Sequence, residues 1–112
     1  MYTVIEQWTP RREFLDATPE EREALFAQVG AAMPELEAAG VTCLGWSRTL
    51  PTAHSTGHDW VAVWQMTDTA AVDRFFEAVE AAGWYGWFDQ VNTLGQLVPV
   101  PEVIGQLMGL SA

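Results

Sequence analysis

One carboxylate is a candidate acid–base group because it sits inside an apolar segment near the N-terminus. Glu6 lies between Ile5 and Gln7 in a run, residues 2–9, that is rich in β-branched and aromatic residues and is therefore typical of a strand. A carboxylate in a covered strand loses hydration, which raises its pKa and suits it to act as a base. The competing interpretation is structural, with neighbouring amides fixing the carboxylate. Both interpretations stay open at the level of sequence.

The two histidines provide a second pair of catalytic candidates. His54 and His58 are separated by three intervening residues, and Asp59 follows them, in a loop rich in Pro, Ser and Gly. These residue types and this spacing occur in metal sites, but the loop has no cysteine and no HExxH pattern. We therefore predict a solvated loop without a metal. If the loop folds over a pocket, one histidine could act as an acid or base.

The aromatic stretch from residue 83 to residue 95 is the strongest candidate for ligand binding. It places four aromatic rings in five positions and then passes through Gln90 and Asn92 into a strand-like run. Such rings favour burial, so we expect the stretch to close a pocket or an interface. The two amides would hold substrate oxygens. Together with Trp46, Trp60 and Trp87, the rings could line a flat cavity; for any single ring, plain core or interface is the alternative. The predicted substrate-binding residues are Trp64, Gln65, Trp84, Tyr85, Phe88, Gln90 and Asn92.

The elements that position these residues follow from local patterns. Strands are expected at 2–9, 41–49, 59–66 and 91–98, and helices from residue 19 to about 40, at 69–82 and after residue 101, with a short helical turn in the aromatic stretch. Thr18, Pro19 and Glu21 together predict the start of the first long helix. Pro34 inside that helix predicts a kink or a break.

The order βαββαβ predicts an α+β, ferredoxin-like fold: a four-stranded antiparallel sheet with both long helices on one face and an extra C-terminal helix. Right-handed crossovers give the strand order 4-1-3-2. Glu6 would then lie between strands that carry Gln65 and either Gln90 or Asn92, and strand register decides which amide meets it. We expect one domain over residues 1–112, with residues 99–112 as a C-terminal extension.

The third strand predicts a partner for the sheet. Val61 and Val63 point to one face while Trp60, Ala62 and Trp64 point to the other, so both faces are apolar. Two helices can cover only one face, and the simplest cover for the second is an identical subunit. We therefore expect a homodimer.

Charge and composition exclude several partners. The formal net charge is −10 with only five basic residues, which argues against nucleic acid and against anionic membrane surfaces. Cys43 is the only cysteine, as is typical of a reducing compartment. No apolar run approaches the roughly 20 residues of a membrane span. We expect a cytoplasmic protein.

The strand order, the size and the doubly apolar strands resemble the dimeric α/β-barrel superfamily, which includes antibiotic-biosynthesis monooxygenases. More narrowly, Gly83-Trp84-Tyr85, Phe88 and Gln90-Val91-Asn92 resemble a bacterial branch of unknown function. The resemblance implies a pocket between sheet and helices. Haem-degrading members use a histidine on the second long helix, and residues 69–82 contain none, so haem is disfavoured.

The resemblance implies a cofactor-independent enzyme, similar to the monooxygenases or cyclases of the superfamily, acting on a hydrophobic or aromatic substrate. Glu6 or a loop histidine would deprotonate the substrate. Two alternatives are a non-catalytic ligand-binding or accessory dimer and a purely structural dimer.

Overall fold

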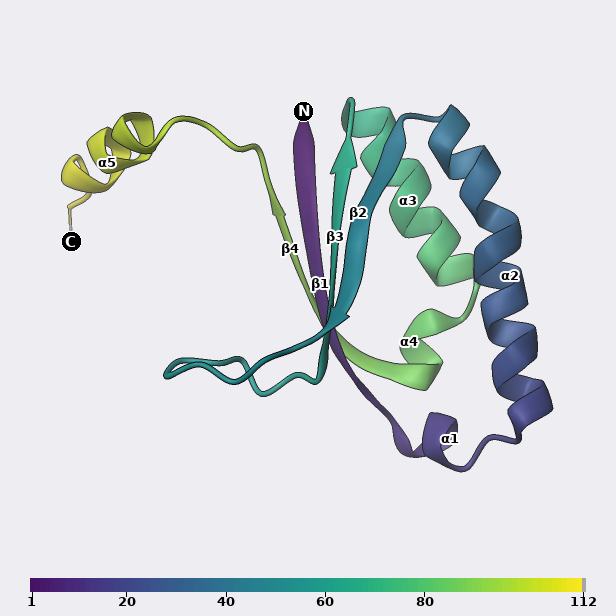
Figure 1. Ribbon diagram of the computed structural model, residues 1–112. Helices are drawn as coiled ribbons and strands as arrows, with labels where there is room; N and C mark the ends of the chain where they lie inside the picture. The colour runs from purple at the N-terminus through teal and green to yellow at the C-terminus, as the bar shows by residue number, and fades with distance from the viewer. Residues whose placement is uncertain (112) are drawn as a thin grey trace.

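A four-stranded antiparallel sheet with two long helices on one face forms the framework (Figure 1). The computed structural model describes residues 1–111. The elements are β1 (Tyr2–Pro10), α1 (Arg12–Leu15), α2 (Pro19–Ala38), β2 (Val41–Arg48), β3 (Trp60–Met66), α3 (Thr69–Ala81), α4 (Trp84–Trp87), β4 (Phe88–Gly95) and α5 (Val100–Met108). The strand order is β2-β3-β1-β4. The predicted ferredoxin-like α+β fold and its strand order are confirmed.

Helix α2 begins where its capping residues predict. The Glu21 N–H donates to Thr18 Oγ1 at 3.1 Å, and the Thr18 N–H donates to Glu21 Oε1 at 3.1 Å, so two otherwise unpaired donors are satisfied. The predicted break at Pro34 is wrong, because α2 runs without interruption to Ala38. Pro34 and Gly30, whose carbonyl loses its bond, are both exposed, so water can replace the missing donor.

Two boundaries differ from the sequence prediction. Residues 12–15 form a short helix that the local patterns did not predict. Strand β4 begins at Phe88, three residues earlier than expected, because Phe88 already pairs with Pro10 of β1 and its ring is buried. Gly83 has a φ of +68°, a conformation that glycine adopts without strain, and this lets the chain turn directly from α3 into α4.

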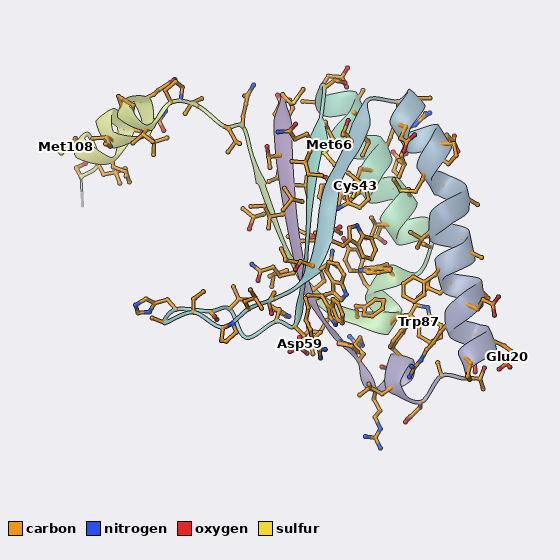
Figure 2. All side chains as sticks on the ribbon, viewed as in Figure 1. Glu20, Cys43, Asp59, Met66, Trp87 and Met108 are labelled. Atoms are coloured by element: carbon orange, nitrogen blue, oxygen red, sulfur yellow. The ribbon has the colours of Figure 1, made fainter. Side chains whose placement is uncertain are left out.

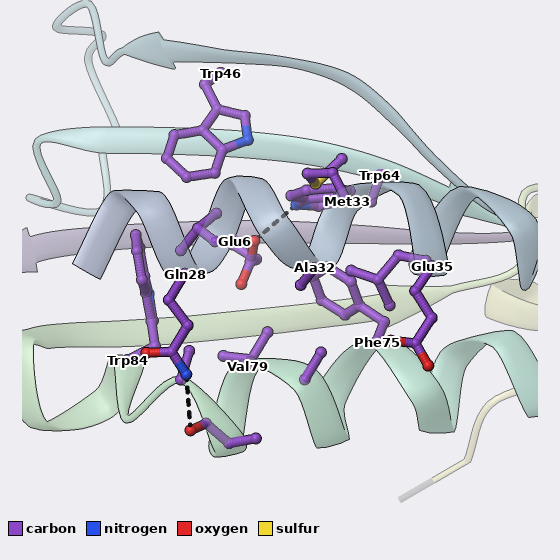
Figure 3. Close-up of a pocket in the computed structure, with 15 residues that line it drawn as sticks. Glu6, Gln28, Ala32, Met33, Glu35, Trp46, Trp64, Phe75, Val79 and Trp84 are labelled. Carbon is purple, nitrogen blue, oxygen red and sulfur yellow. Dashed lines mark hydrogen bonds between the residues drawn. The ribbon is translucent and has the colours of Figure 1, made fainter. Parts of the chain in front are cut away.

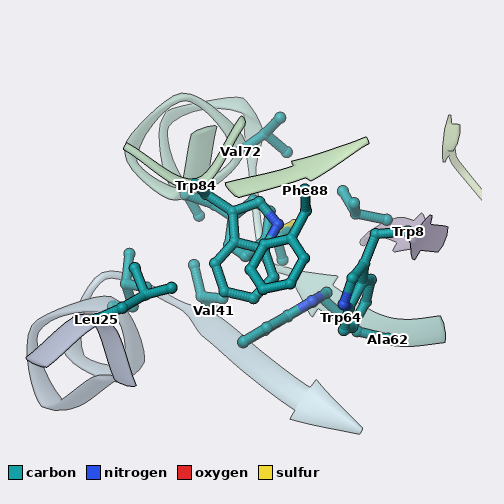
Figure 4. Packing of buried hydrophobic residues seen from close by; sticks show 13 residues of the cluster. Trp8, Leu25, Val41, Ala62, Trp64, Val72, Trp84 and Phe88 are labelled. Atoms are coloured by element: carbon teal, nitrogen blue, oxygen red, sulfur yellow. The ribbon is translucent and has the colours of Figure 1, made fainter. Parts of the chain in front are cut away.

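The core lies between the helices and the sheet face that they cover. Val4, Ala62 and Met66 of the central strands are fully buried on this face. Near the end of the sheet, the rings of Trp84 and Phe88 pack with centroids 4.2 Å apart (Figure 4). This part of the core fixes α4 and the start of β4, the two segments that carry five of the seven predicted ligand-binding residues.

The second face of the sheet is open in the single chain. It presents Ile5, which pairs with Val63 across β1 and β3, and Val61, which pairs with Gln7. The β2–β3 hairpin and α5 project on this side, away from α2 and α3 (Figure 1). All residues of α5 are exposed, and Met108 lies apart from the sheet side chains (Figure 2). Among residues 1–111, no helix has the length and apolar character needed to cross a bilayer.

Candidate functional site

A pocket of about 260 Å³ lies between the covered sheet face and the two long helices (Figure 3). This is the position that the resemblance implied. The strands contribute Glu6, Trp46 and Trp64, and α4 contributes Trp84. The helices contribute mostly small or aliphatic side chains. Those from α2 are Gln28, Val29, Ala32, Met33, Glu35 and Leu36. Those from α3 and its C-cap are Phe75, Ala78, Val79, Ala81 and Ala82.

The Glu6 carboxylate is the polar group at the centre of this pocket. Its side chain projects from β1 toward the helices, and only 5% of the residue is exposed. Trp64 Nε1 donates to Glu6 Oε1 at 2.7 Å, and Gln90 Nε2 donates to Glu6 Oε2 at 2.7 Å. The expected hydrogen bond between Glu6 and the aromatic stretch is therefore confirmed, and Gln90 makes it.

Burial sets the protonation behaviour of Glu6. Loss of hydration raises the pKa of this carboxyl above its ordinary value, although the hydrogen bonds from Gln90 and Trp64 act in the opposite direction. Neither Arg, Lys nor His is found among the residues that line the pocket. A carboxylate with a raised pKa and no positive neighbour is suited to accept a proton from a bound molecule.

A chain of hydrogen bonds fixes the orientation of the amides behind Glu6. Trp84 Nε1 donates to Gln90 Oε1 at 2.6 Å, and because an indole N–H can only donate, the amide NH₂ of Gln90 must face Glu6. Gln90 Nε2 also donates to Asn92 Oδ1 at 2.7 Å, and Asn92 Nδ2 donates to the Tyr85 hydroxyl at 3.0 Å. Burial raises the pKa of Tyr85, and the hydrogen bond from Asn92 opposes this. Trp84 thus orients Gln90, and Gln90 holds Glu6.

Aromatic rings form the apolar walls around the carboxylate. Trp46 lies edge-on to Trp64, with centroids 6.4 Å apart, and edge-on to Trp84 at 5.9 Å. Phe75 packs on Trp64 at 4.8 Å. Trp46 was predicted only as one of several rings that could line a cavity, and Phe75 was not among the predicted site residues. Strand alternation does not assign Trp46 to this face, because a bulge between Cys43 and Gly45 shifts the register of β2.

Strand register corrects the predicted role of Gln65. Glu6 of β1 pairs with Ala62 of β3 and with Asn92 of β4. Gln65 of β3 pairs instead with Thr3, which is three residues before Glu6 on β1. Gln65 therefore points to the open face, opposite the pocket, because side chains alternate along a strand. Trp64 takes the place predicted for Gln65. Asn92 lies across from Glu6 but bonds Gln90 and Tyr85 instead.

The histidines do not reach the pocket. Both belong to the β2–β3 hairpin, which projects on the opposite side of the sheet (Figure 1). His54 is exposed. His58 Nδ1 lies 3.1 Å from Thr9 Oγ1, and the hairpin is tied to β1 a second time by Thr56 Oγ1, which donates to Gln7 Oε1 at 2.8 Å. The loop does not fold over the pocket of its own chain.

Two other predicted ligand-binding residues, Phe88 and Tyr85, do not line the pocket. Phe88 is buried in the core beside Trp84 and is not one of the pocket-lining residues. Tyr85 is half-buried and meets the pocket only through Asn92 and Gln90. Of the seven residues predicted to bind substrate, Trp64 and Trp84 line the pocket directly.

The pocket does not have the ligands of a haem site. Helix α3 carries no histidine, and no histidine, cysteine or tyrosine is among the lining side chains. Across residues 1–111, no group of three or more His, Cys, Asp and Glu side chains is arranged to hold a metal ion. The site chemistry therefore rests on the carboxylate, the amides and the indole N–H groups.

The comparison with protein families decides where this chain belongs. The model of the Family of unknown function (DUF6616) matches residues 1–110. The chain belongs to this family. Among curated proteins, the search found no match.

Solved structures with the same fold extend the comparison of this DUF6616 chain. A mutant chlorite dismutase from Candidatus Nitrospira defluvii has a TM-score of 0.66 at 19% identity, covering 94% of this chain and 43% of its own. The protein At3g17210 from Arabidopsis thaliana has a TM-score of 0.62 at 15% identity, with coverage of 89% and 98%. A dabb family protein with a ferredoxin-like fold from Mesorhizobium loti has a TM-score of 0.57 at 15% identity, with coverage of 88% and 97%. The chain thus spans less than half the length of the chlorite dismutase, and at these identities the likeness shows the fold alone.

Proposed function

We propose that this protein binds a small, largely hydrophobic molecule between the sheet and the helices and uses Glu6 as a base on it, without a resident metal or organic cofactor. The observation that carries the proposal is the nearly buried Glu6 carboxylate in an otherwise apolar pocket, held by Trp64 and Gln90. A volume of about 260 Å³ lies just below the ~300–1,000 Å³ of typical ligand pockets. It therefore favours a ligand of one ring or a short chain.

The chemical step assigned to Glu6 is a proton transfer. An acidic O–H, N–H or C–H bond of the substrate breaks, the proton moves to a Glu6 oxygen, and the electron pair stays on the substrate. Trp64 and Gln90 act as positioning residues, because each holds one carboxylate oxygen in place. The reaction class is that of a cofactor-independent, monooxygenase- or cyclase-like enzyme, as the resemblance implies.

Filling the pocket from α2 tests ligand binding. Ala32 lines the pocket, whereas its neighbour Ala31 is exposed and does not. Ala32→Leu should weaken binding of the neutral probe 2-phenylethanol at least about tenfold, because added methyl groups occupy the ligand volume. Ala31→Leu is the matched control and should leave the affinity unchanged. Chemical-shift titration measures both, and equal affinities in the two variants would contradict the proposed binding site.

We also propose a homodimer closed over the open face of the sheet. Ile5, Val61, Val63 and Val91 lie on that face, and α5 adds an apolar side formed by Val100, Val103, Ile104, Leu107 and Met108, each exposed. Leaving so much apolar area in water is unfavourable. A second copy presents the same surface and can cover it. We propose that residues 1–112 form a single domain in each subunit of this dimer.

Light scattering tests this assembly. At micromolar concentration, the full chain should have twice the 12.4 kDa mass of a single chain. Truncation after Pro99 removes α5 and should shift the dimer toward monomer or reduce its solubility, because the apolar side of α5 no longer contributes cover. A monomeric full chain would contradict the dimer, and an unchanged dimer after truncation would contradict the role of α5.

A further inference from the structure

The charge distribution in the pocket is one-sided. Glu6 and Glu35 are the charged residues among its lining side chains, and both are acidic. Glu35 sits on α2 near the surface, where its carboxylate is 4.0 Å from the Arg74 guanidinium. Glu6 has no ion-pair partner among residues 1–111. When the buried carboxylate is ionised, its negative charge is therefore not neutralised by a basic group of the chain.

The hydrogen bonds around Glu6 match its ionised form. The Trp64 indole N–H can only donate, and Gln90 presents its NH₂ because its oxygen is already occupied by Trp84. A proton on either Glu6 oxygen would find no acceptor in these two groups. A buried carboxylate that accepts two hydrogen bonds but lacks a countercharge remains costly. A positive charge brought by a ligand would remove that cost.

The walls of the pocket are suited to the same kind of ligand. Trp46, Trp64 and Trp84 surround the Glu6 carboxylate with Phe75 nearby (Figure 3). Indole faces attract ammonium groups through the ring quadrupole, and aromatic cages closed by such rings bind organic cations. The net charge of −10 also favours the approach of cations over that of anions.

We propose that the ligand of this pocket is a small organic cation, a protonated amine on an apolar or aromatic body, with its ammonium group on Glu6 among the tryptophans and its body toward α2 and α3. This inference rests on the proposed function and names its substrate class. In the reaction, Glu6 takes the proton of the ammonium group: the N–H bond breaks, its electron pair stays on nitrogen, and the neutral amine becomes nucleophilic.

Three probes of one size and different charge test the inference at pH 7: 2-phenylethylamine, 2-phenylethanol and phenylacetate. The amine should bind at least about tenfold more tightly than the alcohol, and phenylacetate should bind most weakly. An alcohol that binds as tightly as the amine would overturn the cation assignment and leave the proposed pocket intact. Failure of all three probes to bind would overturn both proposals.

Two variants locate the charge preference. Glu6→Gln should remove the preference for the amine over the alcohol. Trp46→Leu is the second variant, because Trp46 is 43% exposed and is not one of the buried core residues. It should lower the affinity for the amine several-fold more than the affinity for the alcohol. Circular dichroism of both variants is the check that each is folded. An amine preference that survives both substitutions would overturn the assignment.

Discussion

The double variant Glu6→Gln with Gln90→Glu should be more stable than either single variant, by roughly 1–3 kcal/mol in the free energy of unfolding. In Glu6→Gln, an amide at position 6 faces two donors, the Trp64 indole N–H and the Gln90 NH₂. An amide has only one accepting end, so either rotamer sets two N–H donors against each other. Trp84 prevents relief by rotation of Gln90, because its N–H requires the Gln90 oxygen.

The other single variant fails for a different reason. Gln90→Glu brings a second carboxylate against Glu6, and two carboxylates in contact cannot both stay ionised. This variant should therefore gain stability as the pH is lowered, since one shared proton removes the repulsion. In the double variant, the amide at position 6 accepts from Trp64 and donates to the carboxylate at position 90, which still accepts from Trp84. Asn92, whose Oδ1 accepts from Gln90 in the native chain, must turn its amide so that Nδ2 donates to the carboxylate at position 90 and Oδ1 accepts from the Tyr85 hydroxyl. With that turn, each donor of the network meets an acceptor.

Urea unfolding of the four proteins measures this coupling. Gln96→Glu makes the same chemical change at an exposed position just after β4, outside the Glu6 network, and serves as the control with a small expected effect. If the two single effects simply add in the double variant, the network does not have the orientation described here.

The stability of the native chain relative to Glu6→Gln should also depend on pH in a defined direction. The pKa of Glu6 is raised on folding, so its contribution to stability is fully present below the ordinary carboxyl pKa of about 4.3 and is lost as the pH rises through the folded value. Taking the difference from the variant cancels the titration of every other carboxyl group. The difference should thus favour the native chain more at acid pH than at pH 7.

Gly40→Ala should destabilise the protein by about 1–3 kcal/mol, while Gly30→Ala should stabilise it by about 0.5–1 kcal/mol. Gly40 joins α2 to β2 with a φ of +100°, which strains any residue with a side chain. A methyl group there would also clash with the Thr67 side chain. Relief by backbone movement is opposed, because the Thr67 N–H donates to the Gly40 carbonyl at 3.1 Å.

Gly30 is the matched control within the same helix-to-strand unit. It lies in α2, and the Cβ of an alanine at this position would have no neighbouring atom within 4 Å beyond the backbone of its own helix. Alanine there therefore adds only helix propensity. Thermal or urea unfolding should therefore move in opposite directions for the two variants. Equal shifts would show that the turn at Gly40 can rearrange.

Local patterns in the sequence were sufficient for the strands, the long helices and their order, but not for the short helix α1. Thr18, Pro19 and Glu21 predict the start of α2 because capping depends only on residues within one turn. Alternation along residues 60–66 predicts the two apolar faces of β3. The burial of Glu6 and its contact with the aromatic stretch follow from the strand order, which connection rules restrict strongly.

The tertiary structure alone decided which side chains meet. Register puts Ala62 beside Glu6 and turns Gln65 to the other face, since a shift of one residue exchanges the two faces of a strand. Gln90 reaches Glu6 from a position opposite Trp8, because Trp84 anchors its amide from α4. The hairpin that carries His54 and His58 projects away from the pocket. Contacts between distant segments depend on register, on bulges and on the packing of helices over the sheet, and none of these is encoded in a window of neighbouring residues.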